Sequence, residues 1–361
     1  MANVKFNFKR IIISVLILAV IFAAGWVAFD IFLPRQVLSG ESLEIGRVTH
    51  QTFGHNNMSL LAANDGLFLV NRRGEIVWRV NERFTAPFMS VNGDYILHSG
   101  RNEREFVIYR NRRETVRSET GDNIILGVVN RNGYAAIVTE TPLANGLVTV
   151  YNRSGNEIYR LRVGDGHITD IDISPNNQIL AVSKISAGGA AIYSTVTFID
   201  ISRNEEISVV RRENSMIVAV QYNRDGSSVA LSDTEMIGFS GNGQIRFSVD
   251  FDGRTLSTFN FDSENCLVLA FQTGRGNTTL EFYNRDGRLR GSYAAQGRIR
   301  NITVSGDVVL ASRLRTVLRF TPAGRVEELV TVSHDIVDLQ IMGDRRYALV
   351  VGGANSRVIR F

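Results

Sequence analysis

A two-strand pattern recurs along almost the whole chain of 361 residues and restricts its fold more than any other feature. Each copy has an apolar strand, a polar turn that often carries glycine, and a second strand. Asn, Asp and Gly tolerate the positive φ that tight hairpin turns need, so the pattern predicts β-hairpins. The clearest copies are Leu67–Trp78, Val148–Tyr159 and Leu280–Leu289, and looser copies lie in Ile108–Arg113, Phe198–Asn204, Gly238–Gly243 and Leu318–Gly324.

A second unit precedes most of these hairpins and consists of an alternating strand, a turn and a strongly apolar strand. Together the two units give four strands every roughly 37–47 residues, which is the spacing of β-propeller blades. No long helical periodicity follows residue 40, so an all-β fold is predicted. The second unit recurs at Phe88–His98, Leu126–Val138, Thr169–Val182, Val218–Leu231, Thr258–Ala270, Asn301–Ala311 and Val337–Val350.

The hairpins also give the number of blades. Seven are complete, and an eighth apolar strand, Arg357–Phe361, ends the chain. The alternating segment Leu43–Arg47 precedes the first full blade and can supply the missing outer strand of the eighth. Such a shared blade closes the ring and protects its edges. We therefore predict eight blades, with seven as the alternative if the first or last repeat is misread.

An apolar run without charged residues, Ile11–Phe29, precedes the repeats. About 20 apolar residues cross a bilayer as a helix, and Lys5, Lys9 and Arg10 before the run keep the N-terminus in the cytoplasm by the positive-inside rule. A cleaved signal peptide ending near Ala23–Gly25 is the alternative, and both interpretations export the propeller. The predicted organisation is a basic tail (1–10), a transmembrane signal anchor (11–33), a short linker (34–41) and the propeller (42–361).

The charge of the exported part limits its partners. The formal net charge is +4, and the three basic residues of the tail leave about one unit for the rest, which argues against nucleic-acid binding. One local exception is an arginine-rich region, where arginine alternates with Leu, Thr and Phe. Such alternation is typical of a half-exposed strand, but it also makes the region a candidate contact patch for an anionic envelope polymer or an acidic protein. The patch comprises Arg298, Arg300, Arg313, Arg315 and Arg319.

No catalytic, cofactor or metal motif is found in the sequence. His50 and His55 lack further ligands at a usual spacing, and His98, His167 and His334 are expected in turns or at blade edges. The aspartates at 165, 170 and 172, and those at 250 and 252, do not follow a calcium-loop pattern, and we expect turn and strand-edge roles for them. The one cysteine, Cys266, has apolar neighbours and is expected in a buried strand.

The segments Asn64–Val70 and Arg73–Trp78 carry Asp-Gly, an aromatic strand, Gly-Glu and Trp in the order of the PQQ-like propeller repeat. With the basic tail and apolar helix, the chain resembles an uncharacterised bacterial family of membrane-anchored PQQ-like propellers. That resemblance implies PQQ-like or WD40-like four-stranded blades. The superfamily includes quinoprotein dehydrogenases, which pair adjacent cysteines and carry tryptophans in most blades, and scaffolds such as the lipoprotein propeller of the outer-membrane β-barrel assembly machine. Cys266 alone, with only Trp26 and Trp78, favours the scaffold branch.

These observations favour a non-enzymatic, single-pass protein of the cell membrane. Its propeller is expected to act outside the cytoplasm as a protein-binding or scaffolding module, held to the lipid bilayer by the N-terminal helix and bound to an envelope protein partner. Loops on a rigid ring are a common place for such binding. The alternatives are an envelope hydrolase or lyase with its site at the central channel, and a ligand-sensing ectodomain.

Overall fold

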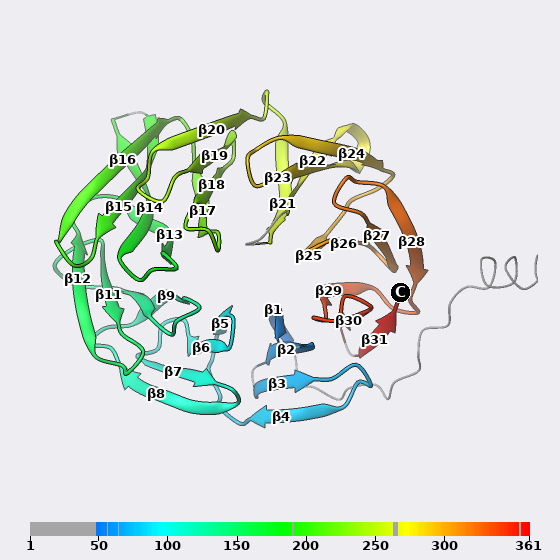
Figure 1. Cartoon of the computed structure of the whole chain (residues 1–361), viewed down its shortest axis with the longest axis horizontal. Helices are drawn as coiled ribbons and strands as arrows, with labels where there is room; N and C mark the ends of the chain where they lie inside the picture. The colour runs from blue at the N-terminus through cyan, green and yellow to red at the C-terminus, as the bar shows by residue number, and fades with distance from the viewer. Residues whose placement is uncertain (1–47, 56, 64, 190, 263–265, 354) are drawn as a thin grey trace, which may run out of the picture. The chain divides into compact units, whose positions relative to one another are not determined.

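The computed structural model describes residues 48–361, apart from residues 56, 64, 190, 263–265 and 354. Eight antiparallel sheets follow one another along the chain and are arranged around a central channel (Figure 1). Seven sheets have four strands and the last has three described strands. The prediction of an all-β propeller with eight blades is confirmed. The predicted basic tail, transmembrane anchor and linker, and the segment Leu43–Arg47, lie outside the described residues.

Each blade begins at the channel and ends at the rim, so the strands fall into four concentric sets. The innermost strands are β1 (Val48–His55), β5 (Pro87–Asn92), β9 (Ile124–Val129), β13 (His167–Ile173), β17 (Ile217–Tyr222), β21 (Thr255–Phe261), β25 (Asn301–Ser305) and β29 (Ile336–Ile341). The second strands are β2 (Met58–Ala63), β6 (Tyr95–Gly100), β10 (Ala135–Thr139), β14 (Ile179–Gly188), β18 (Ser228–Ser232), β22 (Cys266–Thr273), β26 (Val308–Arg313) and β30 (Tyr347–Gly352).

The outer half of each blade is the predicted hairpin. The third strands are β3 (Gly66–Val70), β7 (Glu105–Arg110), β11 (Gly146–Tyr151), β15 (Ala191–Asp200), β19 (Glu235–Phe239), β23 (Asn277–Asn284), β27 (Thr316–Phe320) and β31 (Ser356–Arg360). The rim strands are β4 (Ile76–Val80), β8 (Arg113–Glu119), β12 (Glu157–Val163), β16 (Glu205–Glu213), β20 (Ile245–Asp250), β24 (Leu289–Ala295) and β28 (Val326–Thr331). A single 3₁₀ turn, η1 (Gly274–Gly276), interrupts the described strands.

The turns of the outer hairpins repeat one hydrogen-bonding arrangement. In the first blade, Asn71 Oδ1 accepts hydrogen bonds from the backbone N–H groups of Arg73 and Glu75. Gly74 then adopts φ 83°, which a side chain would oppose. The same bonds form around Asn152 and Asn284. The Asn-x-x-Gly spacing in the sequence therefore encodes the turn directly.

The core lies between neighbouring blades, because the second and third strands are buried on both faces. Large aromatic side chains bridge the joints; for example, Phe198 of β15 packs on Phe239 of β19 with ring centroids 5.0 Å apart. The ring closes where Leu61 and Val70 of the first blade join a cluster with Leu349 and Val358 of the eighth. Cys266 is buried in β22, as the sequence predicted.

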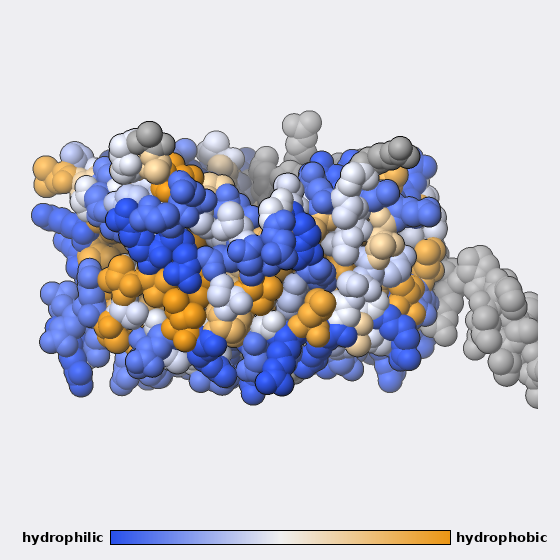
Figure 2. Space-filling model, turned by 90° about the horizontal axis from the view of Figure 1, so that it is seen from above, coloured by the Kyte–Doolittle hydropathy of each residue, from blue (hydrophilic) through white to orange (hydrophobic). Residues whose placement is uncertain are grey.

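The rim strands are amphipathic, with one face on the core and one face in solvent. Some of their solvent-facing residues are apolar, including Val209 of β16 (52% exposed), Ile245 of β20 and Leu289 of β24. A view from the side shows apolar patches at mid-height on the rim, between hydrophilic upper and lower margins (Figure 2). Charged neighbours such as Arg211 and Glu213 interrupt the apolar run along β16, which protects this edge strand from pairing with other chains.

Candidate functional site

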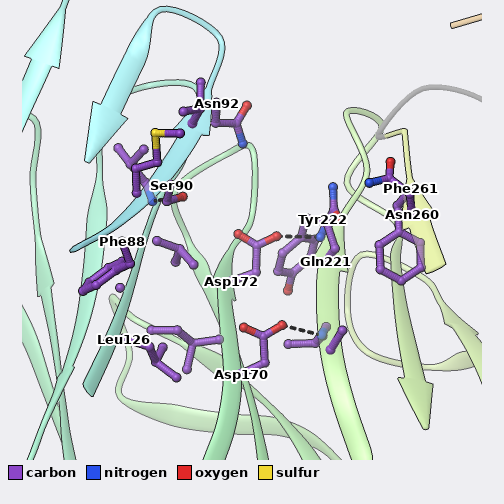
Figure 3. A pocket seen from close by; sticks show the side chains of 18 of the residues that line it. Phe88, Ser90, Asn92, Leu126, Asp170, Asp172, Gln221, Tyr222, Asn260 and Phe261 are labelled. Carbon is purple, nitrogen blue, oxygen red and sulfur yellow. Dashed lines mark hydrogen bonds between the residues drawn. The ribbon is translucent and has the colours of Figure 1, made fainter. Parts of the chain in front are cut away.

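Two hollows lined by charged side chains stand out in the described part of the chain, and the first is the central channel. The inner strands of blades two to six line a cavity of about 460 Å³. Asp170 and Asp172 of β13 lie on its wall, with Ser90 and Asn260 on other strands (Figure 3). Phe259 and Phe261 of β21 add an aromatic pair with ring centroids 5.2 Å apart.

The two channel carboxylates join the fourth blade to the fifth. Asp170 Oδ2 accepts a hydrogen bond from the backbone N–H of Val220 (2.8 Å), and Asp172 Oδ2 accepts one from Tyr222 (2.7 Å). The other oxygen of Asp172 accepts the N–H of Ile173 (2.8 Å). Backbone donors thus occupy both oxygens of Asp172, which gives this side chain a structural role at a strand edge, as we expected.

Similar bridges recur at other joints between inner strands. Ser90 Oγ accepts from Val129 N–H (3.1 Å), and Asn260 Oδ1 accepts from Val304 N–H (3.3 Å). Because the innermost strand of each blade has an open edge, its amides need acceptors from elsewhere. Ser, Asp and Asn side chains of the preceding blade supply them at these three joints.

The channel nevertheless changes the acidity of its two aspartates. Water reaches both side chains, but protein encloses them on most sides, and this desolvation raises the pKa of Asp170 to about 6 and that of Asp172 to about 7. Hydrogen bonds from the backbone act in the opposite direction and are the weaker influence. Perturbed carboxylates can mark catalytic sites, but no group of three His, Cys, Asp or Glu side chains suited to a metal ion occurs among the described residues.

The second hollow, which we call the arginine depression, lies where the sixth, seventh and eighth blades meet. It has a volume of about 670 Å³. The links β24–β25 and β28–β29 and the turn β26–β27 lie at the same end of their sheets, since successive strands are antiparallel. The side chains that line it come from these three connections: Gln296, Gly297, Arg298, Arg300, Arg313, Leu314, Arg315, Thr316 and Asp335.

The structure thus brings together four of the five arginines in the predicted patch. Arg315 Nε donates to Asp335 Oδ1 (2.7 Å), and this contact lowers the pKa of the Asp335 carboxyl. Arg313 donates to the backbone carbonyl of Gln296. Arg298 and Arg300 are exposed and form no ion pair with any residue in the described part of the chain. One carboxylate therefore faces four guanidinium groups.

Arg319 lies apart from the depression. It is half-buried on β27, where it donates to Glu327 Oε2 (3.1 Å) and lies over the ring of Phe361. The fifth arginine of the predicted patch is thus paired within its own blade and with the end of the chain. The alternation of arginine with apolar residues in the sequence placed Arg319 in the predicted patch, but Arg319 does not line the depression.

Leu314 is a feature of the depression that the sequence did not reveal. It is 55% exposed and adopts φ 50° in the two-residue turn between β26 and β27. Among the described residues with a positive φ, glycine aside, it is the only one with an apolar side chain. The turn is held by the backbone bond from Ile336 N–H to the Leu314 carbonyl (2.8 Å) and by that from Val332 N–H to the Arg315 carbonyl (2.8 Å).

The sequence model of the family of unknown function DUF5711 matches residues 41–361. The chain belongs to this family. No curated protein is significantly similar to it in sequence. The DUF5711 match begins just before the described residues and spans all eight blades.

Solved structures resemble this DUF5711 chain in fold. BamB from Moraxella catarrhalis is 12% identical, with a TM-score of 0.54 over 87% of this chain and 95% of BamB. The C-terminal WD40 domain of Sif2 is 9% identical, with a TM-score of 0.67 over 91% and 99% of the two chains. Chaetomium thermophilum Sqt1, solved bound to the N-terminus of ribosomal protein L10, is 11% identical, with a TM-score of 0.59 over 89% and 100%. These likenesses show a shared propeller fold.

The expected positions of the histidines are partly wrong. His98 lies fully buried in β6, where it packs edge-on against Phe84 with ring centroids 4.8 Å apart. Both of its ring nitrogens lack a hydrogen-bond partner, and burial lowers its pKa to about 4. It behaves as a neutral core residue, because an apolar blade interface disfavours the charged form. His334, by contrast, lies in the link before β29, as we expected.

Proposed function

We propose that this DUF5711 protein is a single-pass membrane protein whose propeller binds partner proteins outside the cytoplasm, as a scaffold of the cell envelope. The observation that carries the binding role is the excess positive charge of the arginine depression. Arg298 and Arg300 are exposed and form no ion pair among the described residues, although Arg300 lies near enough to Asp335 to help lower the pKa of that carboxyl. In the channel, by contrast, each oxygen of Asp172 accepts a backbone N–H. Charge that the fold leaves free is available to a partner.

The structural relatives support binding of protein segments. Sqt1 has a propeller of similar fold and was solved with the N-terminus of another protein bound to it. The propeller offers a rigid ring on which connecting loops from several blades converge, and such loops commonly carry binding residues. We propose the same mode for this chain, with the connections around the arginine depression as the binding loops.

The membrane location is supported by the sequence. Residues 11–33 are long and apolar enough to span a bilayer, and Lys5, Lys9 and Arg10 precede them. Among the described residues, no helix has the length and apolar character needed to cross a membrane. We propose that the segment 11–33 is the anchor and that the propeller lies on the far side of the membrane from the N-terminus.

The topology can be tested with thiol labelling, because the one native cysteine is buried. Ser154→Cys lies on an exposed turn of the third blade, and Ala2→Cys lies before the anchor. In intact cells, a membrane-impermeant maleimide should label Ser154→Cys and leave Ala2→Cys unlabelled until the cells are lysed. Labelling of Ala2→Cys with protection of Ser154→Cys would reverse the proposed orientation.

Crosslinking in cells tests the binding role. A photo-reactive amino acid at Thr316, in the arginine depression, should capture a partner protein, identified by mass spectrometry. The same group at Ser154, on a turn at the other end of the blades, serves as the matched position. The proposal fails if no position on the ring captures a protein while the purified chain binds a small molecule tightly.

A further inference from the structure

We infer that the partner segment recognised by the arginine depression is an acidic peptide with an apolar side chain that packs on Leu314. This inference rests on the proposed binding function and names the chemistry of the partner. It excludes a purely anionic polymer as the main ligand.

The charge of the depression requires a negative partner. Four arginines face one carboxylate, and Asp335 already binds Arg315. Arg298 and Arg300 belong to the link between β24 and β25, whereas Asp335 belongs to the link between β28 and β29, and Arg300 lies near enough to Asp335 to help lower the pKa of that carboxyl. Guanidinium groups bind carboxylates with two parallel hydrogen bonds, so this pair can hold acidic side chains in a defined orientation.

Leu314 adds an apolar contact that charge alone does not explain. An exposed leucine in the middle of a basic hollow gains nothing from water and cannot bind a phosphate or a carboxylate. It can bury against an apolar side chain of a ligand, and protein interfaces combine an apolar centre with a charged margin in this way. The aliphatic parts of the surrounding arginine side chains extend the apolar surface.

The backbone at Leu314 indicates that this leucine is not present for stability. In a two-residue hairpin turn whose first residue has a positive φ, glycine is the favoured residue. A side chain there costs about 1–2 kcal/mol relative to a right-handed conformation. The fold holds Leu314 in place through the bonds to Ile336 and Val332 described above. An apolar side chain presented at the expense of local strain is consistent with a ligand contact.

The test is a binding titration with the full chain in neutral detergent micelles. The probe is a fluorescent peptide in which two leucines are flanked by glutamates, followed by anisotropy. The control probe is the same peptide with serine in place of leucine. Inorganic polyphosphate of similar charge serves as the competitor. Raising the salt from about 0.05 M to about 1 M should weaken binding, because these charges are exposed.

We expect the leucine-containing peptide to bind most tightly. Arg298→Glu with Arg300→Glu should weaken its affinity by about tenfold or more, because like charges then face each other. Leu314→Gly should weaken the affinity for the leucine-containing peptide by about fivefold, as expected for losing a half-exposed leucine contact. The affinity for the serine peptide should change little. The matched control is Arg72→Glu with Arg73→Glu, two exposed arginines in the turn after β3, which should leave binding unchanged.

Two results would overturn the inference. If polyphosphate competes as strongly as the peptide and Leu314→Gly has no effect, the depression recognises charge only, and an anionic polymer is its ligand. If none of the probes binds, or the arginine and control variants bind alike, the depression is not the site. Neither result decides the proposed function, which depends on whether crosslinking in cells captures a protein at any position on the ring.

Discussion

The central channel and the arginine depression are both hollows lined by charged side chains, and they differ in where those charges find partners. In the channel, Asp170 and Asp172 bond to the amides of Val220 and Tyr222 in the neighbouring blade. In the depression, the exposed Arg298 and Arg300 belong to a link between blades and form no ion pair in the described part of the chain, although Arg300 lies near Asp335. The channel charges hold blades together, and the depression charges face solvent.

The comparison shows how a charged cluster in a propeller can be interpreted. Perturbed pKa values alone would point to the channel as the binding site, because burial raises the pKa of Asp172 to about 7. The hydrogen bonds favour the depression as the binding site, because the channel carboxylates already accept backbone N–H groups that join two blades. In these two hollows, hydrogen-bond partners therefore distinguish charges that hold the fold together from charges that a ligand could reach. The pKa values make this distinction less well.

Removing the channel carboxylates should destabilise the fold most. Asp170→Ala with Asp172→Ala leaves the amides of Val220 and Tyr222 without their acceptors. We expect a loss of about 1–3 kcal/mol of unfolding free energy for each amide, measured by denaturant unfolding. Asp172→Asn keeps an acceptor oxygen, so this variant should retain most of the unfolding free energy that Asp172→Ala loses. Equal stability of the alanine variant and wild type would show that these carboxylates do not join the blades.

Leu314→Gly should stabilise the chain while weakening peptide binding. Glycine tolerates φ 50° without the side-chain penalty, so the free energy of unfolding should rise by up to about 1 kcal/mol. Leu143, which is 79% exposed in a loop and has no positive φ, is the matched control. Leu143→Gly should lower stability slightly or leave it unchanged. A destabilised Leu314→Gly variant would mean that the leucine supports the turn itself.

The channel aspartates should also make stability depend on pH. The pKa of Asp172 in the folded state, about 7, lies above its ordinary value of 3.8, so the folded state holds the proton more tightly. The contribution of this group is therefore largest at low pH and is lost as pH rises from about 4 to about 7. Asp172→Asn lacks this contribution, so its stability relative to wild type should increase as pH rises from about 4 to about 7.

Asn260 provides the control for this dependence, since it makes the same kind of bridge without a charge. Asn260→Asp should acquire a decrease in stability over the same pH range, followed as the melting temperature. The buried His98 is present in wild type and variants alike, so its own titration cancels in the comparison. If Asp172→Asn and wild type show parallel pH profiles, the carboxyl does not titrate in the channel as we describe.

The fold could be predicted from the sequence because each blade repeats local signals. The Asn-x-x-Gly turn, the apolar third strand and the alternating rim strand are all encoded within about a dozen residues. The arginine patch was predicted in part for a different reason. Arg298, Arg300, Arg313 and Arg315 are near one another in sequence and meet in space, but the pairing of Arg319 with Glu327 depends on the register of β27 and β28.

Other features depend on how separate blades meet and could not be predicted. The bridges from Asp170 and Asp172 cross to residues about 50 positions later in the chain. The burial of His98 depends on Phe84, in the link before β5. The carbonyl of Leu314, which has a positive φ, accepts a hydrogen bond from Ile336, the first residue of β29 in the next blade. Contacts of this kind leave no periodic pattern in the sequence.

Removing exposed arginines of the depression should change the stability of the chain least. Arg298→Ala with Arg300→Ala removes two exposed charges that make no ion pair among the described residues, so the free energy of unfolding should change by less than about 0.5 kcal/mol. Denaturant unfolding of this variant beside the Asp170 and Asp172 variants gives the direct contrast. Because neighbouring like charges repel, a slight gain in stability at low salt is expected. A loss comparable to that of the channel variants would mean that these arginines hold the sixth and seventh blades together, and the distinction between the two hollows would fail.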